Sequence, residues 1–145
     1  MKGLKKFLGE KGYVNIPLTL TETNHFELAA EINGVEGRFI LDTGASNTCV
    51  DFEFIEHFKL VDEASEVKAS GAGANNMETR IAKKNSISIR NWNKKKVAIV
   101  LFNLTHVNEA LIQHKAVAVH GIIGADILKR GKAVIDYNRK LLFLK

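Results

Sequence analysis

The chain has 145 residues, of which 46% are apolar and 26% charged, a composition that excludes wholesale disorder. Its single cysteine, Cys49, excludes an internal disulfide framework and any zinc site built from several thiolates. The net charge of +5 comes from basic residues spread along the chain and not interleaved with aromatic residues. We therefore interpret it as solubility charge and expect no nucleic-acid partner.

The first twenty residues lack the pattern of a signal peptide. Lysines occur at positions 2, 5 and 6, but Glu10 and Lys11 interrupt the apolar stretch that should follow them. No window approaches the roughly eighteen apolar residues that a membrane-spanning helix requires. We therefore expect a cytoplasmic protein with no membrane partner. Residues 1–12 are expected to form a flexible arm or to contact a second subunit.

Short strands dominate the predicted secondary structure. Apolar residues alternate over residues 14–21, and strands expected at 26–32 and 35–41 flank Asn33-Gly34, a strong two-residue hairpin signal. Further strands are expected at residues 66–69, 79–82, 86–90, 97–103, 133–136 and 141–144. Residues 137–140 read as a tight turn, and Trp92 is expected at an exposed hairpin tip.

Three short helical segments interrupt the strands. They are residues 52–58, residues 108–114 with Asn108 as N-cap, and residues 127–130 with Asp126 as N-cap. No linker or internal repeat divides the chain. We therefore predict one all-β domain with short helices over residues 1–145.

An apolar strand runs directly into the tripeptide Asp42-Thr43-Gly44. By composition, this tripeptide occurs in roughly 3% of chains of this length, so alone it is a weak signal. Gly44 lets the loop approach another backbone closely or adopt positive φ, Thr43 offers a hydroxyl, and Ala45 leaves room beside the carboxylate. If a two-fold axis passed beside this loop, two Asp42 carboxylates would meet and share one proton. Such a pair provides a general acid and a general base for attack by water on a peptide carbonyl.

A second motif lies far along the chain, at residues 121–128. Ile122 and Ile123 are bulky β-formers between Gly121 and Gly124, a pattern that predicts a buried strand passing close to another backbone. Residues 39–46 together with 121–128 resemble the retropepsin-like aspartic proteases, and bacterial single-domain members most of all. In that family an Asp-Thr-Gly loop is held in place by a downstream hydrophobic-hydrophobic-Gly element.

The resemblance implies a closed β-barrel-like acid protease fold with one lobe per chain. It implies that Asp42 is the catalytic carboxylate and that no cofactor or metal is needed. It also implies support of the catalytic loop by Thr43, Gly44, Ala45, Ile122, Ile123 and Gly124. A flap that closes over substrate is implied at Ser70, Gly71, Ala72, Gly73 and Ala74, whose small residues suit a mobile lid.

The resemblance further implies an endopeptidase that works as a homodimer, because one Asp-Thr-Gly per chain supplies only one carboxylate. Two Asp42 side chains, one per subunit, would activate the water that hydrolyses a peptide or protein substrate. Residues 14–20 and 141–144 are candidates for the interface sheet, since unpaired strand edges favour pairing.

Two other functions compete with that of an endopeptidase. A catalytically silent dimeric module could grip peptides or proteins in the same cleft, although the intact Asp42-Thr43-Gly44 favours the enzyme. A basic nucleic-acid-binding β-domain would need aromatic residues that stack on bases, and the predicted strands lack them.

Several polar residues have simpler structural interpretations. Asp42 could merely cap a turn, Asp126 is interpreted as a helix cap rather than a substrate contact, and Asp136 as a turn or salt-bridge residue. Cys49 is interpreted as a buried small apolar residue rather than a nucleophile. The histidines at positions 25, 57, 106, 114 and 120 show no spacing typical of metal ligands.

Overall fold

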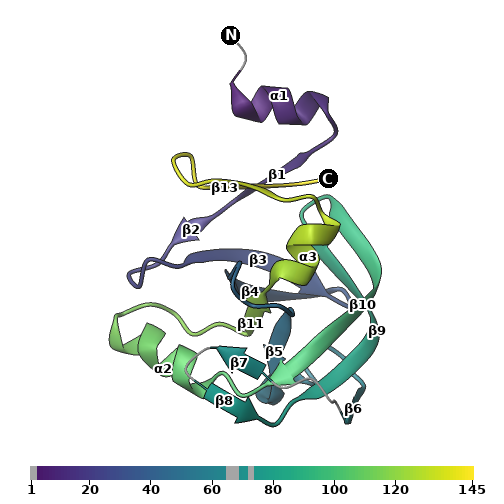
Figure 1. The fold of residues 1–145 in the computed structure, drawn as a ribbon, viewed down its shortest axis with the longest axis vertical. Helices are drawn as coiled ribbons and strands as arrows, with labels where there is room; N and C mark the ends of the chain where they lie inside the picture. Colours follow the sequence, from purple (N-terminus) through teal and green to yellow (C-terminus); the bar gives the residue numbers. More distant parts are fainter. Residues whose placement is uncertain (1–2, 65–68, 72–73) are drawn as a thin grey trace.

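The computed structural model describes residues 3–64, 69–71 and 74–145, and its fold is drawn in Figure 1. The elements in chain order are α1 (Leu4–Glu10), β1 (Val14–Pro17), β2 (Thr19–Leu20), β3 (Phe26–Ile32), β4 (Val35–Leu41), β5 (Cys49–Asp51), the 3₁₀ helix η1 (Phe52–Phe54), β6 (Asp62–Ala64), β7 (Ala69–Gly71), β8 (Ala74–Met77), β9 (Arg80–Ile89), β10 (Trp92–Phe102), α2 (Thr105–Gln113), β11 (Gly121–Ile123), α3 (Ala125–Arg130), β12 (Val134–Asp136) and β13 (Leu141–Leu144).

Six strands close into a barrel in the order β3-β4-β11-β5-β10-β9, because β9 pairs back onto β3. Strands β2 and β6 extend the same sheet beside β3 and β9. The prediction of an all-β protein with short helices and a closed barrel is confirmed. Inside β3, the apolar residues Phe26, Leu28, Ala30 and Ile32 are buried at every second position, which is the alternation that closes one face around a core.

The barrel strands that carry the two sequence motifs are buried on both faces. In β4, Phe39 and Leu41 belong to the main core, whereas Ile40 belongs to a second cluster with Ile122 and Leu111 of α2. Burial on both faces explains why this strand reads as a continuous apolar run instead of an alternating one. Each fully buried side chain of this size contributes about 1.5–3 kcal/mol to folding.

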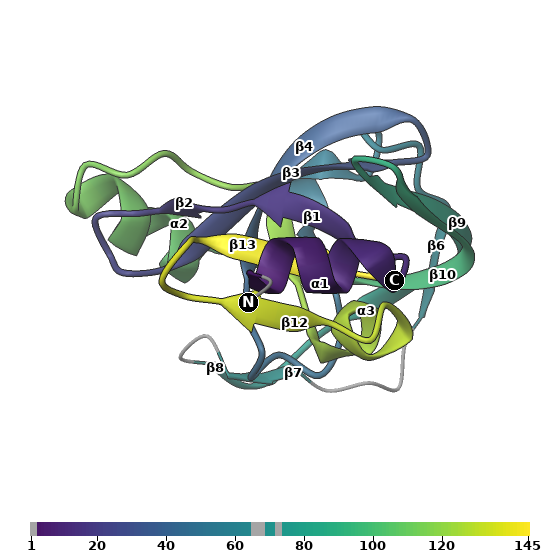
Figure 2. The same ribbon diagram turned by 90° about the horizontal axis from the view of Figure 1, so that it is seen from above.

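The terminal strands form a separate three-stranded sheet in the order β1-β13-β12. Helix α1, which the sequence analysis did not predict, lies over this sheet on the side away from the barrel (Figures 1 and 2). Its Leu8 is buried, and the Tyr13 hydroxyl donates to the Lys132 carbonyl at 3.0 Å. The expectation that residues 141–144 present an unpaired edge is wrong, since β13 pairs on both sides and the edges are β1 and β12.

The hairpin at Asn33-Gly34 is confirmed. Both residues adopt positive φ, 52° and 80°, and the ladder between β3 and β4 begins at Ile32 and Val35. The two strands expected at residues 79–82 and 86–90 are one long strand, β9, whose pairing with β10 shifts register around Asn85. The buried Asn85 amide donates to the carbonyls of Ala82 and Val97, which satisfies the backbone where the ladder is interrupted.

Trp92 was wrongly expected at an exposed hairpin tip. Its side chain is only 4% exposed, and its indole nitrogen donates to the Lys145 carbonyl.

The helix expected at residues 108–114 begins at Thr105, with Leu104 at the N-cap, so Asn108 lies inside α2. Helix α3 begins at Ala125 with Gly124 at the N-cap, so Asp126 is not the cap either. The helix expected at residues 52–58 is a 3₁₀ turn at η1 followed by turns.

Strands β7 and β8 pair as a two-stranded antiparallel hairpin separate from the barrel. The proposed flap residues Ser70 and Gly71 lie in β7 and Ala74 in β8, whereas Ala72 and Gly73 fall outside the described residues. Of the strand expected at 66–69, only Ala69 is described. Among the helices of the described ranges, none has the length and apolar character needed to cross a bilayer.

Candidate active site

Asp42 directly follows β4, and a hydrogen bond to β11 fixes its backbone. Strand β11 lies between β4, to which it is parallel, and β5, to which it is antiparallel. The ladder pairs Ile122 with Ile40 and Ile123 with Leu41, and the Asp42 N–H then donates to the Ile123 carbonyl at 3.0 Å. The hydrophobic-hydrophobic-Gly element and the Asp42 loop (residues 42–48) are therefore neighbours, as the resemblance implied.

The Asp42 carboxylate is oriented by its own loop. The Gly44 N–H donates to Asp42 Oδ1 at 2.8 Å, and the Ala45 N–H donates to the Asp42 carbonyl at 3.2 Å. A Cβ at Gly44 would lie 3.2 Å from Asp42 Oδ1, and Gly44 is not one of the described glycines with positive φ. Close approach to the carboxylate, and not an unusual φ, is thus what position 44 requires. The Asp42 side chain remains exposed.

The two glycines of the downstream element allow β11 to pass between β4 and β5. A Cβ at Gly121 would lie 2.1 Å from the Cys49 carbonyl oxygen, and one at Gly124 would lie 2.7 Å from the Ala45 carbonyl oxygen. Contacts this short do not occur between real atoms, so both positions exclude a side chain. The Ala125 N–H donates to the Ala45 carbonyl at 2.7 Å, which joins the start of α3 to the Asp42 loop. The expected close approach of backbones is confirmed.

Thr48 and Asp126 lock the far end of the Asp42 loop, a link that the sequence analysis missed. Asp126 Oδ1 accepts hydrogen bonds from the Thr48 N–H at 2.9 Å and from Thr48 Oγ1 at 2.8 Å. Thr48 Oγ1 in turn accepts from the Gly124 N–H at 3.0 Å, and Thr48 is fully buried. Asp126 therefore supports the loop across 78 residues of sequence. The only feature of the local sequence that could have indicated this link is the β-branched polar residue Thr48 in the run after Asp42-Thr43-Gly44.

A pocket of about 280 Å³ opens beside Asp42. Ile40 and Ile122 form its floor from the barrel strands, and α2 supplies one wall through Val107, Ala110 and Leu111. Its remaining lining residues are Thr23, His25, Asp42 and His106. His25 Nδ1 lies 2.8 Å from Thr23 Oγ1, so these two side chains fix each other at the rim. The contribution of α2 to the site is not predictable from the motifs around Asp42.

Thr43 faces a different hollow, of about 370 Å³, which we call the Thr43 hollow. The side chains that line it with Thr43 come from α3, the turn that follows it and β12: Ala125, Leu128, Lys129, Lys132, Ala133 and Ile135. The Asp42 loop thus has the apolar pocket on one side and the edge of the terminal sheet on the other.

The remaining candidate residues have structural roles. Cys49 is buried, as expected, and burial raises the pKa of its thiol to about 12, which disfavours the reactive thiolate. Asp136 accepts a hydrogen bond from the Arg139 N–H at 3.0 Å and forms an ion pair with its guanidinium, as expected. Within the described ranges, no three His, Cys, Asp or Glu side chains are grouped to hold a metal ion.

A closed barrel in which a central parallel strand braces an Asp-Thr-Gly loop defines the architecture of an aspartic protease lobe. The family model described as "Aspartyl protease" matches residues 28–127, and the chain belongs to that family. A search among curated protein sequences gives no match.

Three solved structures of retropepsin-like or retroviral-type proteases share the fold of this chain. The retropepsin-like aspartic protease from Rickettsia conorii is 21% identical with a TM-score of 0.60, covering 92% of this chain and 88% of that one. The EIAV protease in complex with the inhibitor HBY-793 is 19% identical with a TM-score of 0.53, covering 79% and 86%. The retroviral protease-like domain of Ddi1 from Leishmania major is 17% identical with a TM-score of 0.54, covering 88% and 90%.

Proposed function

We propose that the protein is a homodimeric aspartic endopeptidase in which two Asp42 carboxylates, one from each subunit, activate a water molecule. The observation that carries this proposal is the Asp42 loop itself. Its carboxylate is exposed but oriented by the Gly44 N–H, and its backbone is fixed by Ile123. An aspartate that only caps a turn does not need a neighbouring strand, here β11, to fix its backbone.

The chemistry follows from bringing two such carboxylates together. Two carboxylates about 3 Å apart cannot both ionise, so the pair holds one proton between them. The ionised member accepts a proton from the attacking water, and the protonated member donates one to the carbonyl oxygen of the scissile bond. Thr43, Gly44, Ala45, Ile122, Ile123 and Gly124 support the loop, and no cofactor takes part.

The Thr43 hollow suggests where the second subunit lies. A two-fold axis that brings two Asp42 side chains together must pass beside Thr43, the next residue. The surface there is partly apolar and borders β12, which is an edge of the terminal sheet. Pairing of β12 with its copy would join two three-stranded sheets and satisfy the edge hydrogen bonds. Because β12 is the strand of the terminal sheet that lines the Thr43 hollow, we assign the interface to β12 rather than to residues 14–20 or 141–144.

The pocket beside Asp42 supports a peptide or protein substrate. Its floor and one wall are apolar, so it suits an apolar side chain next to the scissile bond. The β7–β8 hairpin, with Ser70, Gly71 and Ala74 in its strands, is the candidate flap that would close over such a substrate.

The test is hydrolysis of a peptide library by the purified protein across pH 3–8, beside an Asp42→Asn variant. Because Asp42 is exposed, we expect the variant to keep its fold and its sedimentation behaviour. Its turnover should fall by at least about a hundredfold, the lower end of what general acid–base catalysis contributes. Cleavage that survives in the variant contradicts the mechanism. Peptide binding without any turnover in the wild type would favour the silent binding module instead.

A further inference from the structure

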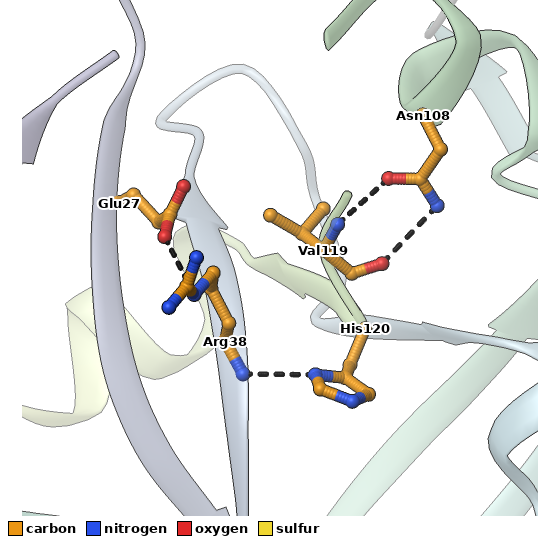
Figure 3. A network of polar contacts seen from close by, with 5 residues as sticks. All are labelled: Glu27, Arg38, Asn108, Val119 and His120. Atoms are coloured by element: carbon orange, nitrogen blue, oxygen red, sulfur yellow. Dashed lines mark hydrogen bonds and ion pairs between the residues drawn. The ribbon is translucent and has the colours of Figure 1, made fainter. Parts of the chain in front are cut away.

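His120 joins β4 and β11 at the end of their ladder that lies away from Asp42. Its N–H donates to the Arg38 carbonyl at 2.9 Å, and the Arg38 N–H donates to His120 Nδ1 at 3.0 Å (Figure 3). His120 therefore forms hydrogen bonds with both the N–H and the carbonyl of Arg38. Its imidazole Nδ1 accepts the hydrogen bond that a backbone carbonyl of a neighbouring strand would normally accept. Because Nδ1 accepts a hydrogen bond, the ring must be neutral and carry its proton on Nε2.

The groups around His120 disfavour protonation of the neutral ring at Nδ1. The ring stacks on His57 with 5.2 Å between centroids and 4° between planes, and Phe54 and Phe58 pack against it edge-on. His57 Nε2 lies 3.3 Å from the Glu36 carbonyl oxygen, which ties the second ring to β4 as well. An imidazolium at position 120 would face the ring of a second histidine, His57, in stacking contact.

Charged groups also approach His120 from the neighbouring strands. The Arg38 guanidinium of β4 forms an ion pair with Glu27 of β3 at 2.9 Å (Figure 3). Glu27, Glu36, Arg38 and Arg90 line a groove together with His120. The carboxylate of Glu27 is engaged by Arg38, so it offers little compensation for a new positive charge on the ring.

The segment that His120 belongs to also positions the pocket beside Asp42. The Asn108 side chain of α2 holds the preceding residue through both backbone groups, accepting from the Val119 N–H at 2.8 Å and donating to the Val119 carbonyl at 3.1 Å (Figure 3). On the other side of His120, the ladder between β4 and β11 runs from Arg38 to Asp42, four residues further along the chain. The last hydrogen bond of this ladder is donated by the Asp42 N–H to the Ile123 carbonyl. Val119 and His120 thus tie the strand of Asp42 to the helix that walls its pocket.

We propose that His120 is a positioning residue, whose neutral ring clamps β4 to β11 and releases this clamp when acid protonates it. Protonation would set an N–H on Nδ1 against the Arg38 N–H, so the hydrogen bond must break. The clamp would give the protein an acid limit separate from the titration of the two Asp42 carboxylates. Its consequence for catalysis rests on the proposed function, whereas the clamp itself does not.

The direction of the pH effect follows from the burial and charges around the ring. Burial has the largest effect and lowers the pKa of His120 from its usual value of 6.5, and the charges of His57 and Arg38 lower it further. The hydrogen bond to the Arg38 backbone raises this pKa, but it is outweighed, so the net direction is down. Between the lowered pKa and about 6.5, the unfolded chain binds more protons at this position than the folded chain. The stabilisation is therefore present above about 6.5 and is lost as the pH falls, by at most about tenfold in the unfolding constant per pH unit.

The experiment measures denaturant unfolding from pH 8 to pH 5 through the single, buried Trp92. In His120→Asn, a carboxamide oxygen replaces Nδ1 as acceptor for the Arg38 N–H and cannot be protonated in this range. We expect its stability to fall less steeply with acid than that of the wild type. His120→Leu removes the acceptor and should be less stable at neutral pH as well. His114→Asn, at an exposed position, is the matched control and should follow the wild-type slope.

Hydrogen exchange of the Arg38 amide measures directly whether its hydrogen bond to His120 Nδ1 is formed. Its protection factor should fall below about pH 6.5 in the wild type and stay constant in His120→Asn. The proposal is overturned if the two proteins have parallel stability profiles, or if Arg38 protection is independent of pH in the wild type. If peptide hydrolysis is never observed while the Arg38 effect persists, the proposed function fails and the clamp stands. If hydrolysis occurs, the acid limb of kcat in His120→Asn should extend to lower pH.

Discussion

At the scale of single residues, Thr48 joins three parts of the site that are far apart in sequence. Its backbone and hydroxyl both donate to Asp126, and its hydroxyl accepts from the Gly124 N–H. A valine has nearly the same shape but no hydroxyl, so Thr48→Val leaves the Gly124 N–H unsatisfied in a buried place. We expect a loss of about 1–3 kcal/mol in unfolding free energy, measured by urea unfolding.

Ser46→Ala is the matched control for Thr48→Val, since Ser46 is an exposed residue of the same loop. Its unfolding free energy should change by less than about 0.5 kcal/mol. A Thr48→Val protein as stable as the control would show that the link to Asp126 contributes nothing to the fold.

Ala45 should set the alkaline side of the pH–rate profile. A serine hydroxyl at this position could donate a hydrogen bond to the Asp42 carboxylate, which stabilises the charged form of the pair. Ala45 cannot donate, so the two carboxylates are expected to keep their shared proton to higher pH, with an optimum in the mildly acidic range. We expect Ala45→Ser to move the upper limb of kcat/KM towards acid.

The control for Ala45→Ser is Ala118→Ser, an exposed alanine in the segment that leads to β11. Its profile should overlay that of the wild type. A profile of Ala45→Ser that overlays the wild type or moves towards base would show that position 45 does not influence the carboxylate pair.

At the scale of elements, β11 decides whether the site can form, because it fits between β4 and β5 only without side chains at its ends. Gly121→Ala would place a Cβ 2.1 Å from the Cys49 carbonyl oxygen, which is backbone and cannot move aside cheaply. We expect this variant to lose more than about 3 kcal/mol of stability or to fail to fold, as thermal unfolding would show.

The same substitution in α1 has the opposite expectation. A Cβ at Gly9 meets no atom within 4 Å, and alanine is favoured over glycine in a helix by about 0.5–1 kcal/mol. Gly9→Ala should therefore raise the melting temperature slightly. If both variants were equally stable, the close passage of β11 beside Cys49 would be wrong.

At the scale of the whole molecule, the proposed activity depends on a second copy. Specific activity should fall on dilution below the dimer dissociation constant. A lysine on an edge strand hinders pairing with another edge, so Ile135→Lys on β12 should raise the dissociation constant at least about tenfold in sedimentation experiments. Asn15→Lys, on the other edge strand β1, should leave association unchanged. Equal effects of the two variants, or constant activity in a monomeric sample, would contradict the β12 interface.

Local patterns accounted for the elements whose environment is local. The Asn33-Gly34 hairpin, the strand into Asp42 and the Ile-Ile-Gly strand were all predictable, because turn chemistry and strand burial leave their mark in consecutive residues. Trp92 was placed wrongly because a neighbouring turn says nothing about the chain terminus that covers it, here Lys145. The start of α2 was missed because Leu104, at its N-cap, gives no side-chain capping signal.

The family and the mostly-β fold could be predicted from short motifs and their order, and the resemblance that these motifs carry implied that the Asp42 loop lies beside residues 122–124. Which other residues surround that loop depends on contacts between segments far apart in the chain. Thr48 meets Asp126 across 78 residues and Arg38 meets His120 across 82, and α2 reaches the pocket beside Asp42 through packing on Ile40 and Ile122. Contacts at such separations depend on how the barrel closes, which the periodicity of neighbouring residues does not encode.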